Sequence, residues 1–182
     1  MYLELRRLSH LRTYLSIKES STLASAFILS RLDYCNSLLA GANNDKLQRL
    51  QRIQNNAARL VLKKRKYDHV TPLLRELHWL PIKARIEYKL AITCFKSLNC
   101  DFPPYISELL IPYTPSRTLR SSHRNNFVVP RVHLKNFGER AFSFSGPSTW
   151  NALPEKIKKT TSLEQFKKSL KTHLFEKHLN AE

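Results

Sequence analysis

Glycine is scarce in this sequence, which contains only three glycines among 182 residues. Average use is roughly 7%, so the deficit disfavours a fold built on tight-turned β structure. With glycines only at positions 41, 138 and 146, a glycine-rich phosphate-binding loop is excluded. No apolar run approaches the ~20 residues of a membrane span. We therefore expect a mainly α-helical, soluble and intracellular protein, nuclear or cytoplasmic, with no membrane partner.

Cysteine is rare as well, and its pattern predicts neither a disulfide framework nor a zinc site. Cys35, Cys94 and Cys100 form no C-x-x-C pair, and no histidines stand at zinc-finger spacing. The first residues carry arginines but no apolar block, so no secretory signal is expected. We interpret the cysteines as small buried hydrophobes in a reducing compartment, and we expect no cofactor and no metal.

Acidic residues are too few to balance the basic ones. The sequence has 31 Lys and Arg against 14 Asp and Glu, which gives a net charge of +17. Such an excess indicates a polyanionic partner, for which the RNA or DNA backbone is the default. The alternative is a basic protein that is merely soluble. Because the cations are clustered and not evenly scattered, the polyanion is the favoured interpretation.

The first cluster of cations lies on and after a helix predicted at residues 44–62. At about 100° per residue, one face of this helix is apolar and consists of Leu47, Leu50, Ile53, Ala57 and Val61. The opposite face is polar and consists of Arg49, Arg52, Asn56, Arg59 and Lys63. The run Lys63, Lys64, Arg65 and Lys66 follows at the end of the helix, where the dipole favours positive charge. This run predicts a phosphate contact or a nuclear-import signal, with a solvated helix cap as the alternative.

A second cluster of cations consists of Arg117, Arg120 and Arg124. It falls in a segment that is rich in proline and serine, which predicts a loop. The predicted nucleic-acid-binding residues, which would contact mainly phosphates, are therefore Arg49, Arg52, Arg59, Lys63, Lys64, Arg65, Lys66, Arg117, Arg120 and Arg124.

Helical periodicity, capping boxes and prolines predict further helices at residues 2–15, 17–39, 71–77, 81–98, 103–110 and 163–179. Gly41 is expected just past a helix end, and Thr71 as an N-cap. The later half of helix 81–98 is apolar nearly all round, so we expect it at the centre of the core. Trp79 should fill the corner before this helix, and His78 is interpreted as structural.

Residues 111–146 show little helical periodicity and predict a loop-rich segment with room for one short β-hairpin. Its first strand would be 126–132, which Pro130 restricts to a sheet edge, and its partner would be 142–144. Pro147 is expected to open a one-turn helix that holds Trp150.

Several short sequence words occur in order along nearly the whole chain. They are SRLDYCNSLL at 30–39, LQRLQ at 47–51, NNAAR at 55–59, LRELHWLP at 74–81, PYTPSR at 112–117, VPR at 129–131 and WNALP at 150–154. Together they resemble the region beyond the polymerase palm in reverse transcriptases of non-LTR retrotransposons, the jockey-like and related LINE elements of animals. The resemblance implies a helical thumb-like region at 1–100 and a C-terminal extension at 101–182. In the intact family protein, this region would help to hold template RNA and target-primed DNA.

The sequence lacks the carboxylates with which a polymerase holds two magnesium ions. Its aspartates are Asp33, Asp45, Asp68 and Asp101, which are never adjacent and form no [Tyr/Phe]-x-Asp-Asp turn. No nucleophile, base and orienter are marked as a catalytic set either. The resemblance thus implies a detached part of an RNA-directed DNA polymerase, starting at an internal methionine, that is not an enzyme by itself.

Three classes of function remain open at this stage. The first is a non-catalytic module that binds RNA or a primer–template. The second is a protein-interaction scaffold, whose exposed apolar helix faces within residues 2–39 would contact the missing palm or another protein, or else a translated relic with no present role. The third is an active polymerase or nuclease subunit.

Overall fold

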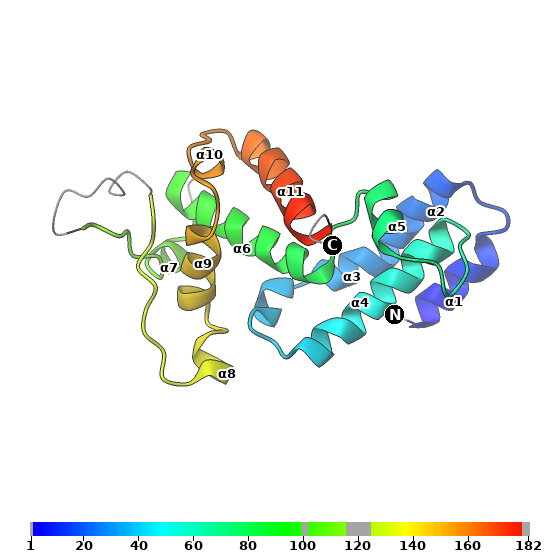
Figure 1. Ribbon diagram of the computed structural model, residues 1–182, viewed down its shortest axis with the longest axis horizontal. Coiled ribbons are helices and arrows are strands. Elements are labelled where there is room, and N and C mark those ends of the chain that lie inside the picture. Colours follow the sequence, from blue (N-terminus) through cyan, green and yellow to red (C-terminus); the bar gives the residue numbers. More distant parts are fainter. Residues whose placement is uncertain (1, 100–101, 116–124, 180–182) are drawn as a thin grey trace. The chain divides into compact units, whose positions relative to one another are not determined.

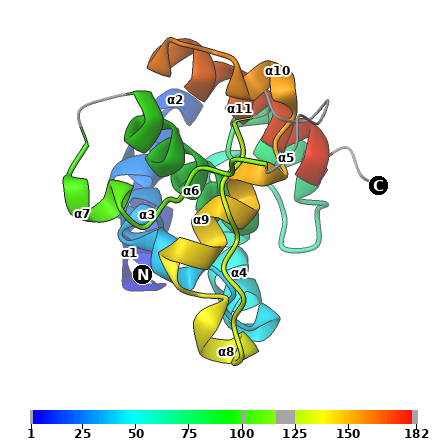
Figure 2. The same cartoon turned by 90° about the vertical axis from the view of Figure 1, so that its left-hand side faces the viewer.

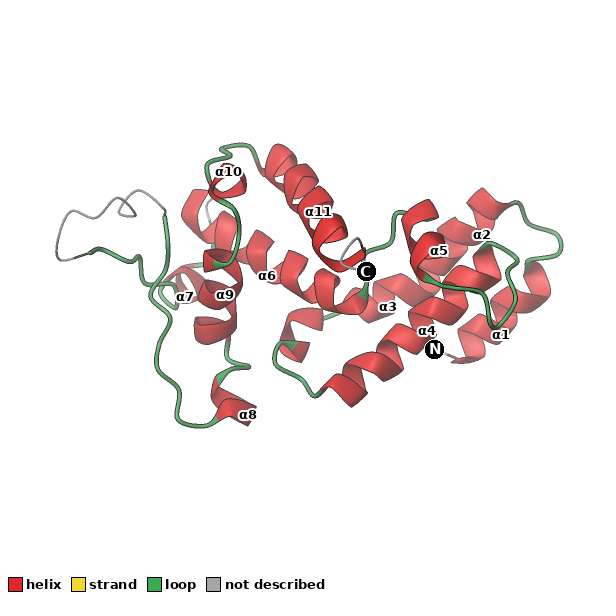
Figure 3. Cartoon of the chain, viewed as in Figure 1, coloured by secondary structure: helices red, strands yellow, loops and turns green. Residues whose placement is uncertain are grey.

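The fold is given by a computed structural model that describes residues 2–99, 102–115 and 125–179. These residues are mainly helical and include no β-strand, which confirms the mainly α prediction (Figure 3). The chain forms two compact units, described separately below. Unit 1 contains residues 1–36, 43–85 and 175–182, and unit 2 contains residues 37–42 and 86–174. The unit boundaries after residues 85 and 174 fall within long helices, and the boundary after residue 42 falls between helices. No helix in the described ranges is long and apolar enough to cross a membrane.

Unit 1 is built around one long helix, α4 (Asn44–Val61) (Figure 1). This helix packs against α1 (Tyr2–Leu11), α2 (Ile17–Ala24), the π-helical segment η1 (Ser25–Leu29) and α5 (Thr71–Glu76). The side chains of Leu47, Ile53, Ala57 and Val61 are buried, as the predicted apolar face requires, while Leu50 is half-buried. The Asn43 side chain accepts a hydrogen bond from the Asp45 N–H and so caps the helix.

Residues 2–39 are more broken than the two helices predicted for them. The first helix ends at Leu11 and not at residue 15. The capping box at Ser16 and Glu19 is present and confirms the predicted start of α2. The second predicted helix is interrupted by η1, continues as α3 (Ser30–Asp33), and ends before the 3-10 turn η2 (Asn36–Leu39).

A local contact explains the break after α3. The backbone of Cys35 is left-handed, with a φ of 49°, and buried Asn36 donates a hydrogen bond from Nδ2 to Oδ1 of Asp33 at 3.4 Å. Asp33 also forms an ion pair with Arg85 at the start of α6 (Ile82–Asn99). These contacts redirect the chain where local periodicity alone would continue the helix.

The corner between α5 and α6 is closed by a Schellman motif. The N–H of Trp79 donates to the carbonyl of Leu74 at 2.9 Å, and the N–H of His78 donates to that of Arg75 at 3.0 Å. His78 is left-handed with a φ of 53°, and its ring lies edge-on to Phe175. Trp79 is buried, which confirms that it fills this corner. The N-cap of α5 is Val70 and not Thr71, so that prediction was wrong by one residue.

Unit 2 has an aromatic core between the later part of α6 and α11 (Leu163–Leu179). The rings of Phe95 and Phe166 are stacked at 4.3 Å, and Trp150 lies 5.8 Å from Phe166. The shorter helices are α7 (Pro104–Ser107), α8 (Lys135–Gly138), α9 (Phe142–Asn151) and α10 (Glu155–Lys158). Helix α9 lies against α6, because a Cβ on Gly146 would stand 3.3 Å from the Cys94 sulfur (Figure 2). Leu90 and Cys94 are buried, whereas Leu98 is exposed. The last turn of α6 therefore contacts the core on one side and solvent on the other.

The predicted β-hairpin is absent from the described residues. Among the described residues, one antiparallel bridge forms, between Pro112 and Phe127, and residues 142–144 belong to α9. Pro147 lies inside α9 and does not open it. Segment 125–127 is instead held by α9: the Trp150 indole donates to the Asn125 carbonyl at 2.7 Å, and the Asn151 amide bonds both backbone groups of Phe127. The side chains of Trp150 and Asn151 therefore satisfy backbone groups that a second strand would otherwise pair.

The cysteine predictions have mixed outcomes. Cys94 is fully buried, as expected, but Cys35 is exposed. Cys100 lies outside the described residues. Gly41 has a positive φ of 65°, as expected for a residue just beyond a helical turn.

Candidate nucleic-acid interface

The polar face of α4 is exposed except at Arg59. Arg49, Arg52 and Asn56 are exposed, and they lie on the side of the cylinder away from buried Ile53 and Ala57. This burial pattern is the one predicted from the sequence. The two exposed arginines are one turn apart, so their guanidinium groups can reach the same extended polyanion.

Arg59 is placed differently from its two neighbours on this face. It is half-buried, and its Nε and Nη2 both donate to the main-chain carbonyl of Asp68, at 3.2 Å and 3.1 Å. A guanidinium that caps a carbonyl in this way is largely committed to the fold. Arg59 therefore stabilises the turn, whereas the cations around it are exposed and form no such bonds within the described part of the chain.

The run 63–66 forms the C-terminal cap of α4. The N–H of Lys64 donates to the carbonyl of Arg59 at 2.9 Å, and the N–H of Lys63 donates to that of Leu60 at 3.3 Å. These two bonds make a Schellman motif in which Lys63 is left-handed, with a φ of 53°. The N–H of Arg65 then donates to Oδ2 of Asp68 at 2.7 Å. The four cations are thus presented by an ordered turn, and all four side chains are exposed.

Among the described residues, the side chains of these exposed cations form no ion pair with a carboxylate. In the part of the chain that the structure describes, the ion pairs include those of Arg7 and Arg31 with Glu4 and that of Arg85 with Asp33. None of them involves the exposed cations of α4 or of the run 63–66. We call this group the α4 basic surface, and it consists of Arg49, Arg52, Lys63, Lys64, Arg65 and Lys66. The positive charge of this surface has no paired negative charge, and a polyanion can supply one.

Sequence analysis missed an aromatic residue beside this surface. Tyr67 follows the cationic run directly, and 89% of it is exposed. The ammonium of Lys66 lies 5.9 Å from the centre of its ring. An exposed aromatic ring next to cations can stack on an unpaired base. The signal that could have identified it is its position immediately after four cations.

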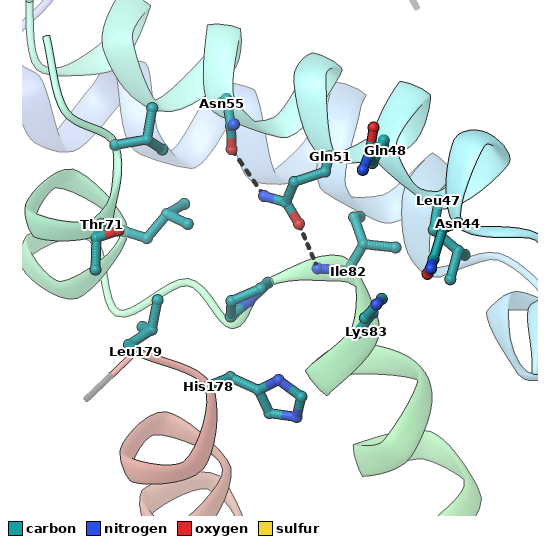
Figure 4. A pocket seen from close by; sticks show the side chains of 13 residues that line it. Asn44, Leu47, Gln48, Gln51, Asn55, Thr71, Ile82, Lys83, His178 and Leu179 are labelled. Atoms are coloured by element: carbon teal, nitrogen blue, oxygen red, sulfur yellow. Dashed lines mark hydrogen bonds between the residues drawn. The ribbon is translucent and has the colours of Figure 1, made fainter. Parts of the chain in front are cut away.

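Sequence analysis also missed a pocket beside α4, with a volume of about 360 Å³ (Figure 4). One wall carries a row of amides at helical spacing: Asn44, Gln48, Gln51 and Asn55. The opposite wall comes from residues 70–83 and the end of α11. The spacing of the amides by four, three and four residues was a readable signal in the sequence.

The second predicted cluster cannot be placed. Arg117, Arg120 and Arg124 lie outside the described residues. Their role as a second cluster of phosphate contacts remains a prediction from the sequence.

Titratable groups with perturbed pKa values lie elsewhere in the fold. Burial raises the pKa of the Cys94 thiol to about 12 and also raises the pKa of Tyr88. Hydrogen bonds from Ser16, its backbone N–H first and then its hydroxyl, hold the pKa of Glu19 below its ordinary value of 4.5. Within the described ranges, no three His, Cys, Asp or Glu residues gather as a potential metal site. The α4 basic surface can therefore bind a ligand through charge and hydrogen bonds, and neighbouring Tyr67 can add stacking.

Searches of protein-family models, curated proteins and solved structures find no match to this chain.

Proposed function

We propose that this chain is a non-catalytic module that binds RNA or single-stranded DNA through its phosphates. The observation that carries the proposal is the α4 basic surface, in which exposed cations of one helix and its ordered cap have no carboxylate partners among the described residues. Each cation placed on a phosphate releases condensed counterions, and this release supplies most of the sequence-independent affinity.

The proposal extends to the origin of the chain. The words at 30–39, 47–59, 74–81 and 150–154 resemble the region beyond the palm of LINE reverse transcriptases, in which a helical thumb helps to hold template and primer. On this proposal the chain derives from an RNA-directed DNA polymerase but does not polymerise, because its aspartates are never adjacent. It would act inside the cell, in the nucleus or cytoplasm, where such a template is found.

Several of these words have structural roles that do not require nucleic acid. Asp33 pairs with Arg85, Trp79 fills a corner, and Asn151 holds the backbone of Phe127. These contacts explain those residues by packing and hydrogen bonding within the fold, whereas the side chains of the α4 basic surface form no hydrogen bond or ion pair among the described residues. This division supports a surface function for the cations.

Fluorescence anisotropy with labelled single-stranded RNA and DNA, over a series of salt concentrations, tests the proposal. We expect the logarithm of the binding constant to fall linearly with the logarithm of salt, with a slope of about −0.7 for each phosphate contact. Absence of binding at low salt, or an affinity that does not respond to salt, would contradict it. A primer-extension assay with magnesium should give no product.

A second candidate function is a protein-interaction scaffold. Its support is an apolar groove of about 240 Å³ between α1 and the α2–η1 segment, lined by residues that include Leu8, Leu11 and Phe27. Leu11 and Phe27 are about half exposed, at 52% and 50%. On this candidate, the chain self-associates or binds a hydrophobic dye. A monodisperse monomer that binds no such dye would count against it.

A further inference from the structure

The pocket beside α4 has the size and lining of a site for a small polar ring. Its volume of about 360 Å³ is at the lower end of the range for small-ligand pockets, roughly 300–1,000 Å³. Apolar side chains, Leu47, Leu74 and Leu179 among them, supply apolar contact surface. No aspartate or glutamate lines the pocket, so its chemistry does not favour a cationic ligand.

Part of its polar lining is committed to the fold. Gln51 accepts a hydrogen bond at Oε1 from the Ile82 N–H at 2.8 Å and donates from Nε2 to Asn55 Oδ1 at 2.7 Å (Figure 4). It also donates to Gln54, whose own amide donates to the Leu80 carbonyl at 2.8 Å. These bonds fix the wall of the pocket and the turn that faces it.

The remaining polar groups are uncommitted. The amides of Asn44 and Gln48, the Nδ2 of Asn55 and the hydroxyl of Thr71 have no hydrogen-bond partner among the described residues. Figure 4 shows the Gln48 and Asn44 side chains on the α4 wall and Thr71 across the pocket. Amides and a hydroxyl both donate and accept, which suits the alternating donors and acceptors on the edge of a nucleobase.

The pocket also lies next to the α4 basic surface. Around the α4 cylinder, the buried face, the amide row and the arginines follow one another at about 100° per residue. Gln48 and Arg52 are four residues apart, so they occupy neighbouring positions on the helix. A strand whose phosphates follow the exposed cations of α4 therefore passes along the rim of the pocket.

We infer that this pocket receives one unstacked base of a single-stranded nucleic acid. The inference rests on the proposed function and specifies its ligand as single-stranded, because a base inside a duplex cannot leave the stack without cost. The phosphates are held by the α4 basic surface, and the base is held by Gln48, Thr71 and the apolar walls. Binding thus combines a charge contribution that depends on salt with a base contribution that does not.

The test compares strands of equal length and charge by anisotropy with the full chain. The probes are oligouridylate, oligoadenylate and an abasic strand of the same phosphate number. Wild-type protein should bind at least one base-bearing strand about tenfold more tightly than the abasic strand, a difference of about 1.4 kcal/mol.

Combining Gln48→Ala with Thr71→Val changes no charge and should bring that ratio close to one. The affinity for the abasic strand and the salt slope should stay as in the wild type. Asn56→Ala is the matched control, since it removes an exposed amide of α4 that lies outside the pocket. It should leave the ratio unchanged.

Three results would overturn the pocket assignment. The first is a wild-type ratio near one, and the second is a ratio that persists in the combined variant. The third is a ratio that Tyr67→Ala abolishes and the combined variant does not, which would assign base recognition to stacking on Tyr67. In each case, salt-dependent binding would leave the proposed function standing. If no strand binds at any salt concentration, the proposed function itself fails.

Discussion

The guanidinium of Arg59 donates two hydrogen bonds, at 3.2 Å and 3.1 Å, to the main-chain carbonyl of Asp68. This pair closes the turn that carries the run 63–66, because Asp68 in turn accepts the N–H of Arg65. The helix and its cap therefore hold the exposed cations in a fixed arrangement. The arginines of this helix face therefore have different roles: Arg59 stabilises the turn, whereas Arg49 and Arg52 are exposed to solvent.

The first prediction separates these arginines. Arg59→Gln should lower the free energy of unfolding by about 1–2 kcal/mol, because the Asp68 carbonyl loses a charged donor. Arg49→Gln with Arg52→Gln should leave stability nearly unchanged but reduce the salt slope of binding by about 1.4, at 0.7 for each contact. Urea denaturation and salt-dependent anisotropy measure the two effects. Equal loss of slope for Arg59 and for one exposed arginine would show that Arg59 also contacts phosphate.

The second prediction concerns the left-handed backbone of Lys63. A non-glycine residue in this region costs roughly 1–2 kcal/mol. Glycine avoids this steric cost because it has no Cβ, but it gives part of the gain back through its larger loss of backbone entropy on folding. Lys63→Gly should therefore raise the free energy of unfolding by about 0.5–1 kcal/mol. The matched control Lys63→Ala removes the same charge but should give no gain, because alanine keeps the steric cost. A gain of equal size from alanine would assign the effect to charge and not to the backbone.

The third prediction tests the buried amide that joins α4 to the turn before α6. Gln54 is fully buried, and its Nε2 donates to the Leu80 carbonyl at 2.8 Å. Gln54→Leu fills similar space but removes a donor from a buried carbonyl, so we expect a loss of about 1–3 kcal/mol. Gln48→Leu, on the exposed side of the same helix, should change stability by less than about 0.5 kcal/mol. Similar losses for both variants would contradict the assigned role of Gln54.

The fourth prediction follows from the raised pKa of Cys94, about 12 against an ordinary value of 9.0. In a chain with Cys35→Ser and Cys100→Ser, the remaining thiol should not react with a thiol reagent at pH 8 until the protein unfolds. Because the pKa is raised in the folded state, its stabilising contribution is complete below pH 9 and is lost as pH rises from 9 toward 12. Replacement of Cys94 by alanine should make stability less sensitive to pH in that window. Rapid labelling of the native protein at pH 8 would contradict the burial.

Regular helices could be predicted from the sequence, whereas irregular connections could not. The stripe of α4 and its Asn43 cap are local patterns, and so are the stripe and start of α11, so periodicity and capping sufficed. The break at Cys35 depends on Asn36, Asp33 and the distant Arg85, and no local rule contains that contact. The hairpin prediction failed for the same reason, since the Asn151 amide replaces the partner strand.

The candidate site divides in a similar way. The exposed arginines and the cationic run were predicted because charge and helical spacing are visible in the sequence. The commitment of Arg59 was not, because it depends on a backbone carbonyl nine residues away. The pocket required knowing that residues 70–83 and 178–179 face the amide row of α4.

The proposed function requires that a local cluster of cations, and not the overall charge of +17, binds nucleic acid. The most direct measurement is the salt slope of single-stranded RNA binding for two variants of equal net charge. The first replaces Lys63, Lys64, Arg65 and Lys66 by glutamine, and the second replaces exposed Lys18, Lys156, Lys159 and Lys168 by glutamine. We predict that the first lowers the slope by about 3, at roughly 0.7 for each lost contact, and that the second leaves it close to the wild-type value. Equal slopes for the two variants would contradict the claim.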